Sequence, residues 1–214
     1  MDDLNRAIPP MSFSRVTIGG DSTTPSYACA VSTQGRLACW GDSLPASSPI
    51  LGDVPDGTGF RSIAAGREFV CVLEAGGRPV CWGKAPGEAP NGQFVSIGAS
   101  KNNACGATAE GKIQCWGAIS GIGDAFPRNP TYIDVVGASD SDTVCALTMV
   151  GQIACVVLGR AVVLADKGPF EELTVGRDHA CAIRRDRTVM CWDPATGALK
   201  SDYDALANLR AVAR

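Results

Sequence analysis

Histidine, aromatic residues and charge of one sign are all scarce in this sequence. Only one histidine is present, His179, which excludes His-rich metal sites and most histidine-dependent catalysis. Lys and Arg number 19 against 22 Asp and Glu, and no block of either sign occurs, so the clustered basic residues that grip nucleic-acid phosphates are missing. The longest apolar run, 153–165, contains Arg160 and is too short to span a bilayer. We therefore expect neither a nucleic-acid partner nor a transmembrane segment.

Cysteine and glycine are abundant instead, with 10 Cys and 25 Gly among 214 residues. In chain order the cysteines make five pairs, each with a separation of ten positions. The pairs are Cys29–Cys39, Cys71–Cys81, Cys105–Cys115, Cys145–Cys155 and Cys181–Cys191. Similar text surrounds every pair, and four of the second cysteines are followed by tryptophan. Text that recurs with a period of about 38 residues indicates a repeat architecture.

An aromatic-led apolar segment precedes each cysteine pair and sets the repeat boundaries. We place five repeats at 13–59, 60–93, 94–131, 132–169 and 170–194, between an N-terminal segment, 1–12, and a C-terminal segment, 195–214. Leu209–Arg214 aligns with Phe60–Ala65, so the C-terminal segment ends in a partial sixth repeat strand. The fifth copy has Arg187 where the other four have Gly. For the four tryptophans we predict packing between neighbouring repeats; they are Trp40, Trp82, Trp116 and Trp192.

A short turn separates the two cysteines of each pair. Folding residues 29–39 into a hairpin about Gln34 places Cys29 directly opposite Cys39, and facing residues of antiparallel strands come within disulfide distance. The same arithmetic applies to every copy, so we predict five disulfides, each closing a short loop worth roughly 2–3 kcal/mol. Buried thiols in a reducing compartment remain an alternative. A zinc site is disfavoured because the cysteine spacing does not fit one and histidine ligands are lacking.

Segments of four to six residues, rich in Val, Ile and Leu and punctuated by Gly, indicate strands. Each repeat would supply an aromatic-led strand and the two cysteine-bearing strands, with the segment after Trp-Gly adding a fourth strand or a loop. Repeats of short strands need neighbours to bury their sheet faces, and radial stacking meets that need. The predicted fold is an all-β propeller of five, or six, blades with a cross-strand cysteine pair in each.

The repeat resembles that of the regulator of chromosome condensation (RCC1) family. Phe60-Arg-Ser-Ile-Ala-Ala-Gly66 and Val80-Cys-Trp-Gly83 carry the likeness, which covers residues 13 to 193. It is nearest to the cysteine-paired variety of bacterial secreted proteins and crinkly-type receptor ectodomains. The resemblance implies a propeller, usually of about seven blades, that binds macromolecules through loops on one face. Family members include a nucleotide exchange factor for a small nuclear GTPase and protein inhibitors of β-lactamase.

The chain departs from that family pattern in three ways. It has five full copies, it lacks the Gly-Gln-Leu-Gly that often follows Trp-Gly, and it ends inside a sixth copy. Nothing in it matches the exchange factor's partner-binding residues, so none is transferred to this sequence.

Three motifs suggest chemistry, and each is better explained as part of the repeat or a loop. Gly41-Asp42-Ser43-Leu44 matches an esterase motif with Ser43 as nucleophile, but the only histidine directly follows Asp178 and no Asp-x-x-His accompanies it. Residues 117–123 lack the last Gly and the Lys of a phosphate-binding loop. Asp140 and Asp142 offer too few oxygen ligands for a cation. We expect no catalytic residue, no cofactor and no metal.

The repeats differ most between the aromatic leader and the first cysteine, where the separations are 16, 11, 11, 13 and 11. Equivalent loops of a propeller emerge on one face, and charged residues recur in these loops. Charged, variable loops on a rigid scaffold are typical of protein recognition, although unconstrained drift in loop length is the alternative. The candidate partner-binding residues are Asp21, Arg67, Glu68, Lys101, Asp140, Asp142, Arg177 and Asp178.

The sequence predicts a non-enzymatic propeller that binds protein partners or serves as a subunit of a larger assembly, with no small-molecule ligand expected. A secreted inhibitor or lectin-like binder of the same fold is an alternative, as is an exchange-factor-type regulator if the cysteines are reduced. Disulfides would place the protein in the periplasm, a lumen or the extracellular space. Because the acidic start, Met1–Leu4, precedes no apolar stretch, we expect a processed or partial chain. Reduced cysteines would instead place it inside the cell.

Overall fold

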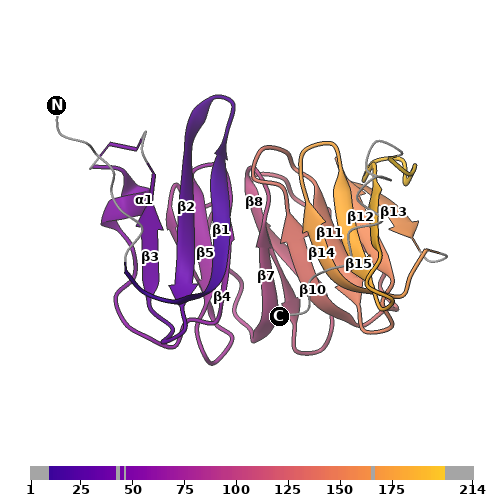
Figure 1. Cartoon of the computed structure of the whole chain (residues 1–214), viewed down its shortest axis with the longest axis horizontal. Coiled ribbons are helices and arrows are strands. Elements are labelled where there is room, and N and C mark those ends of the chain that lie inside the picture. Colours follow the sequence, from indigo (N-terminus) through magenta and orange to yellow (C-terminus); the bar gives the residue numbers. More distant parts are fainter. Residues whose placement is uncertain (1–9, 42–43, 46, 165–166, 201–214) are drawn as a thin grey trace.

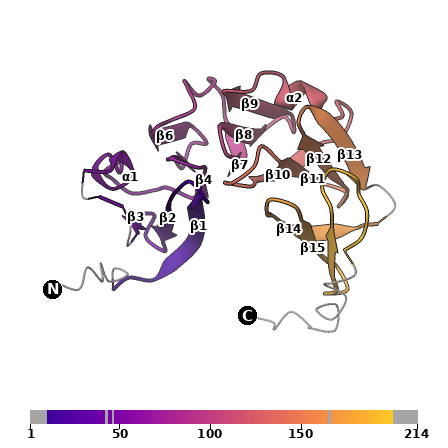
Figure 2. The same ribbon diagram turned by 90° about the horizontal axis from the view of Figure 1, so that it is seen from above.

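The computed structural model describes residues 10–41, 44–45, 47–164 and 167–200. Five antiparallel sheets make up this part of the chain, four with three strands and one with four, and each follows the order of the sequence. The sheets stand side by side in Figure 1, and Figure 2 shows them as an arc of blades around a common axis. The all-β propeller architecture with five blades is confirmed. The strand predicted at Leu209–Arg214 lies outside the described residues.

The strands follow the repeat. Blade 1 has β1 (Phe13–Asp21), β2 (Thr24–Ser32) and β3 (Leu37–Trp40). Blade 2 has β4 (Ser62–Ala65), β5 (Phe69–Leu73) and β6 (Pro79–Gly83), and blade 3 has β7 (Phe94–Ala99), β8 (Asn103–Thr108) and β9 (Ile113–Gly117). Blade 4 has β10 (Tyr132–Gly137), β11 (Val144–Thr148), β12 (Ile153–Val157) and β13 (Arg160–Leu164). Blade 5 has β14 (Phe170–Val175), β15 (Ala180–Arg184) and β16 (Val189–Trp192).

The segment after the second cysteine strand differs from blade to blade. In blade 4 it adds the fourth strand, β13, whereas after blades 1 and 3 it is a loop with one helical turn, α1 (Pro49–Gly52) and α2 (Ile122–Ala125). The α1 turn packs against β6, where the indole N–H of Trp82 donates to the carbonyl of Ile50 at 3.2 Å. The loop after blade 1 therefore helps to cover the next blade.

All five cysteine pairs are disulfides, as predicted. Cys29 pairs with Cys39 in the β2–β3 register and Val31 with Leu37, and the equivalent register holds in the other four hairpins. The Cα atoms of the paired cysteines are 3.9–4.1 Å apart, and the described residues include no free cysteine. Ten paired cysteines indicate an oxidising compartment, because cytosolic thiols are kept reduced.

The two faces of every blade carry different residues. We call the face with the two cysteines the forward face, because it packs on the next blade; the opposite face, which carries the tryptophan where one is present, is the rear face. Between blades 2 and 3, for example, Cys71 and Leu73 pack on Ile97 and Trp116. The same pairing of a forward face with a rear face recurs at all four interfaces between blades. Alternation of side chains along a strand produces both faces from one sequence pattern.

The aromatic residue that leads each repeat belongs to the rear face. Its ring lies 5.7–6.0 Å from the tryptophan of the same blade in the pairs Phe13–Trp40, Phe94–Trp116 and Phe170–Trp192. Trp82, Trp116 and Trp192 are buried between blades. Aromatic pairs at such distances add about 0.5–1.5 kcal/mol to the hydrophobic gain of burying the rings. The leader and the tryptophan are therefore one packing unit, contributed by the first and third strands of a blade.

The first strand of each blade lies nearest the axis. In chain order, β1 packs on β4, β4 on β7, β7 on β10 and β10 on β14, so these five strands surround a central channel. Glycine allows close approach here: a Cβ atom at Gly98 would lie 2.7 Å from the carbonyl oxygen of Val135 in the next blade.

Candidate partner-binding face and central channel

The loops between the first and second strands of the blades meet on one face. Backbone hydrogen bonds join them in sequence: Gly20 donates to Gly66 at 3.2 Å, Arg67 to Lys101 at 3.3 Å, and Lys101 to Ser141 at 2.8 Å. We call these linked loops, 19–24, 66–69, 99–103, 137–144 and 176–180, the loop face. Each of the first three blades is thus fixed to the next by a backbone hydrogen bond between their loops, which makes this part of the loop face a rigid surface.

Asp21 is the electrostatic centre of the loop face. Its carboxylate is only 1% exposed, covered by its own loop and by two cations, with Lys101 Nζ at 3.2 Å and Arg67 Nε at 3.6 Å. The hydroxyl and backbone N–H of Thr23 and the hydroxyl of Thr24 also donate to it. Hydrogen bonds, that from the Thr23 hydroxyl above all, hold the pKa of Asp21 well below its usual range against the opposing effect of burial. Asp21 therefore holds the two cations, and its own side chain is almost fully buried beneath them.

The acidic residues of the blade 4 loop are also paired. Asp140 accepts from Nε of Arg177 in blade 5 at 3.0 Å, and Asp142 accepts from the backbone N–H of Asn102 in blade 3 at 3.2 Å. These contacts tie the blade 4 loop to both neighbours, so the two carboxylates stabilise the face and do not converge on one point. In blade 5, a hydrogen bond with His179 lowers the pKa of Asp178.

A cleft of about 390 Å³ opens on the loop face between blades 2 and 3. Arg67, Glu68, Lys84 and Lys101 supply its charged lining, with Pro86 among its apolar residues. Lys84 Nζ donates to Glu68 at 2.6 Å, yet the Lys84 side chain is 70% exposed. With Asp21 counted behind Arg67 and Lys101, three cations and two carboxylates leave this cleft one positive charge in excess, although the whole chain has a formal net charge of −3.

The sequence did not single out Lys84. Lys84 follows the Trp-Gly of the second repeat, where the first and third repeats have Asp42 and Ala118. The feature of the sequence that could have identified it is therefore a basic residue at a position where the other repeats have none. Asp42 and Ser43 of the esterase-like motif lie outside the described residues. Within the described ranges, no group of three or more metal-binding side chains occurs and no helix is long and apolar enough to cross a membrane.

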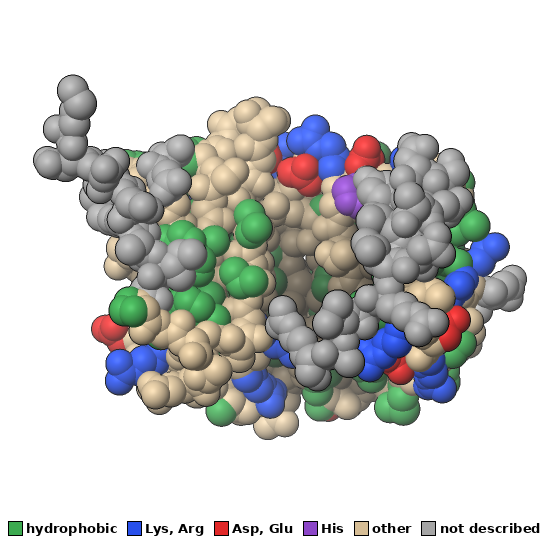
Figure 3. Space-filling view, in the orientation of Figure 1, with side chains coloured by type: hydrophobic (Ala, Val, Ile, Leu, Met, Phe, Trp, Pro, Cys, Tyr) green, Lys and Arg blue, Asp and Glu red, His purple; other side chains and the backbone are tan. Residues whose placement is uncertain are grey.

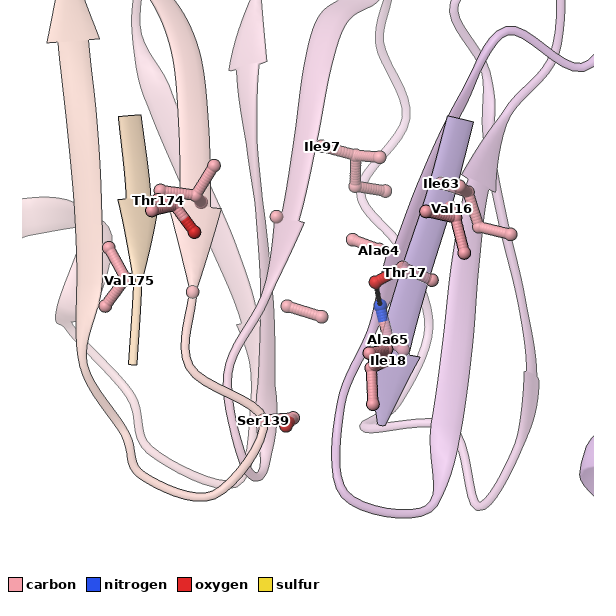
Figure 4. Close-up of a pocket in the computed structure, with 14 residues that line it drawn as sticks. Val16, Thr17, Ile18, Ile63, Ala64, Ala65, Ile97, Ser139, Thr174 and Val175 are labelled. Atoms are coloured by element: carbon pink, nitrogen blue, oxygen red, sulfur yellow. Dashed lines mark hydrogen bonds between the residues drawn. The ribbon is translucent and has the colours of Figure 1, made fainter. Parts of the chain in front are cut away.

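The central channel is a second concave feature. Its part nearer the loop face has a volume of about 500 Å³ and an apolar lining from the first strands of all five blades. Figure 4 shows Val16 and Ile18 of β1 and Ile63 of β4 on one side, with Thr174 and Val175 of β14 across from them. The hydroxyl of Ser139 in blade 4 donates to the carbonyl of Gly20 in blade 1, at 3.2 Å, so two loops meet over the channel.

The other end of the channel is more polar. A cavity of about 560 Å³ is lined there by Arg15 of blade 1, Asp134 of blade 4, and Glu171 and Glu172 of blade 5, among others. Ser96 donates to the Asp134 carboxylate from the neighbouring blade. The channel thus changes from an apolar to a charged lining along its length.

No protein-family model matches the chain, and no curated protein matches it by sequence. Solved structures do match. The crinkly ectodomain of an Arabidopsis thaliana receptor kinase superposes with a TM-score of 0.64 at 22% identity, over 90% of this chain and 68% of that one. The ectodomain of a Physcomitrella patens receptor kinase gives 0.61 at 19% identity, over 85% and 54%. Prp20p of Saccharomyces cerevisiae, the yeast RCC1, gives 0.57 at 17% identity, over 78% and 56%.

These likenesses confirm the predicted RCC1-like propeller fold. The chain spans only 54–68% of the length of these three structures. The yeast protein has been characterised for binding to Gsp1p and histones and crystallised with Kap60, which are properties of that protein.

Proposed function

We propose that the chain is a non-enzymatic, protein-binding propeller, a subunit or accessory of a larger assembly, that recognises an acidic segment of its partner in the cleft between blades 2 and 3. The observation that carries the proposal is the local excess of positive charge on a net acidic chain. Exposed charges of one sign steer a partner of the opposite sign and select against others.

The geometry of the cleft supports this role. Asp21 holds Arg67 and Lys101 in place from behind, so these long side chains are ordered before a partner arrives. Preorganised side chains lose less conformational entropy on binding, which leaves more of the contact energy as affinity. The cleft presents cations and one carboxylate without a nucleophile and base in contact, and for that reason we propose binding and not catalysis.

A protein partner fits the cleft better than a nucleic acid. Beyond the cleft, the carboxylates of Asp140 and Asp142 interrupt the basic surface of the same face. The positive charge is therefore confined to the cleft, which suits a short acidic segment better than an extended phosphate backbone. The five disulfides support a site outside the reducing cytosol, in the periplasm, a lumen or the extracellular space. The exchange-factor alternative required reduced cysteines and is not favoured.

The test is co-purification from the secreted or luminal fraction of the native source, with the tagged chain as bait. The variant is Lys84→Glu, and the matched control is Lys112→Glu, an exposed lysine at the β8–β9 turn on the opposite end of its blade. We expect a stoichiometric partner whose recovery falls at least roughly fivefold with Lys84→Glu and at higher salt, and stays unchanged with Lys112→Glu. Equal recovery with both variants would contradict the proposal. Inhibition of a co-purified enzyme would assign the inhibitor alternative.

A further inference from the structure

The arc of blades is open. Figure 2 shows a gap between blade 1 and blade 5, on the side where neither has a neighbour. Within the described residues, the rear face of blade 1 and the forward face of blade 5 are therefore the two sheet faces that have no blade packed on them. Every other rear face in the chain packs on a forward face.

The rear face of blade 1 carries the same residue types as the buried rear faces. Val16 of β1 is equivalent by repeat position to Ile63 and Ile97, which are 9% and 4% exposed, yet Val16 is 64% exposed. Ile18 is 68% exposed, whereas its equivalent in blade 2, Ala65, is buried. Figure 3 shows hydrophobic side chains gathered over β1–β3, beside the hollow of the channel.

Trp40 shows the same contrast on the third strand. It is half-buried, while the three tryptophans at its repeat position are buried against the preceding blade. A tryptophan and two aliphatic side chains on a soluble sheet face form the kind of apolar patch that marks an interaction surface.

The forward face of blade 5 is likewise more exposed than the forward faces of the other blades. Cys181 is half-buried, whereas each of the other four first cysteines is 0% exposed. Ile183, two residues further along β15, is half-buried as well, while its equivalents Val31 and Leu73 are covered by the next blade. In the part of the chain that the structure describes, one rear face and one forward face thus have no blade packed on them, and these are the two kinds of face that pack together at the four interfaces between blades.

We propose that these two faces bind a β-sheet partner of two blades, built from the same cysteine-paired repeat, that enters the gap and completes the ring. The rear face of the partner would pack on Cys181 and Ile183, and its forward face on Val16, Ile18 and Trp40. The match to the Arabidopsis thaliana ectodomain covers 68% of that chain, and the unmatched 32% has the length of about two repeats. This proposal does not rest on the proposed function, since the loop face is not part of either interface.

A second copy of this chain fits less well. Docked head-to-tail, it would bring five blades to a gap that Figure 2 shows to be narrower than the five-blade arc. Head-to-tail contacts that do not close generate open filaments, and a copy that extends past the gap would collide with blade 1. The partner must therefore be smaller than the chain itself.

The probe is a polypeptide with residues 60–131 of this chain, which are blades 2 and 3 and carry one exposed face of each kind. It is co-secreted with the full chain, and the mass of the complex is measured by light scattering after size exclusion. We expect a one-to-one complex. Val16→Asp on the full chain should weaken it at least roughly tenfold, because the new carboxylate would be buried without a partner. The matched control, Val150→Asp, changes a valine that is 65% exposed in the β11–β12 turn and should leave the complex unchanged.

A second measurement covers the case in which the probe does not fold by itself. Residues 60–131 are joined through a flexible linker to the end of the full chain, and acrylamide quenching of Trp40 is isolated by difference from Trp40→Phe. We expect quenching of Trp40 to fall several-fold in the extended chain once all its cysteines are oxidised. Unchanged quenching in a fully oxidised extended chain would overturn the proposal. A homodimer that Val16→Asp disrupts would also overturn it, since a second copy would then occupy the gap. Binding of the probe only after deletion of residues 201–214 would overturn it as well, since the chain's own end would then be the occupant.

Discussion

Removing one disulfide at a time tests how much each blade's disulfide contributes to the free energy of unfolding. In blade 2, Cys71→Ala with Cys81→Ala opens a loop with a sequence separation of 10. The loop-closure relation for a loop of this length gives about 2.7 kcal/mol at 25 °C. Cys71 is 0% exposed between blades 2 and 3, so loss of its buried sulfur adds about 1 kcal/mol. The expected loss of unfolding free energy is about 3–4 kcal/mol.

The matched variant is Cys181→Ala with Cys191→Ala in blade 5. Its loop has the same separation, so the loop-closure contribution is the same. Cys181 is half-buried on the open forward face, and less packing is lost there. We expect the blade 5 variant to be destabilised by about 1 kcal/mol less than the blade 2 variant.

Equilibrium urea unfolding followed by circular dichroism measures the free energy of unfolding of both variants. The two values can be compared if the unfolding free energy depends on urea concentration with the same slope in both. Free-thiol counts confirm that the other four pairs stay oxidised. A blade 5 variant that loses as much as the blade 2 variant would refute the argument that its forward face lacks a neighbour. A loss below about 1 kcal/mol in blade 2 would refute the loop-closure reasoning, because the hairpin would then hold its structure without the bond.

Three further changes test single residues. Asp21→Asn should make the free energy of unfolding less dependent on pH below about pH 5. The pKa of Asp21 is lowered in the folded state, so its ionised carboxylate stabilises the fold fully above about pH 5 and progressively less as the pH falls. The urea midpoint of the variant should therefore lie below that of the wild type at about pH 6 and approach it towards about pH 2. Arg187→Gly should stabilise the chain by about 1 kcal/mol in thermal unfolding, since Arg187 has φ of 67° where the other repeats have glycine, and no gain would show that its side chain compensates for that backbone. Tyr27→Phe should cost about 1–2 kcal/mol, because the phenol donates to the carbonyls of Gly66 and Phe69 at 2.9 and 2.7 Å in a buried site, and a neutral result in urea unfolding would mean that water replaces it.

The repeat determined the blade, because everything needed to form it lies close together in the sequence. The spacing of ten between Cys29 and Cys39 has one hairpin register that brings them face to face, and side-chain alternation assigns Cys29 and Trp40 to opposite faces. The same text in five copies then predicted five sheets that need one another for burial. Recurrence of charge in equivalent loops likewise placed those residues on one face.

Contacts between blades, and not the repeat sequence, determine which side chains are exposed and which charges lie together. The sequence predicts Asp21 as a partner-binding residue of its loop, and it does not indicate that Lys101, 80 positions further along the chain, reaches Asp21 from blade 3 and covers it with Arg67. Lys84 acquires its place in the cleft only through the loop of the next blade. Trp40 and Trp82 stand in the same sequence context, yet one is half-buried and the other buried. A local pattern fixes which face a side chain is on, whereas its exposure depends on whether another blade packs there, and that is a property of the arc as a whole.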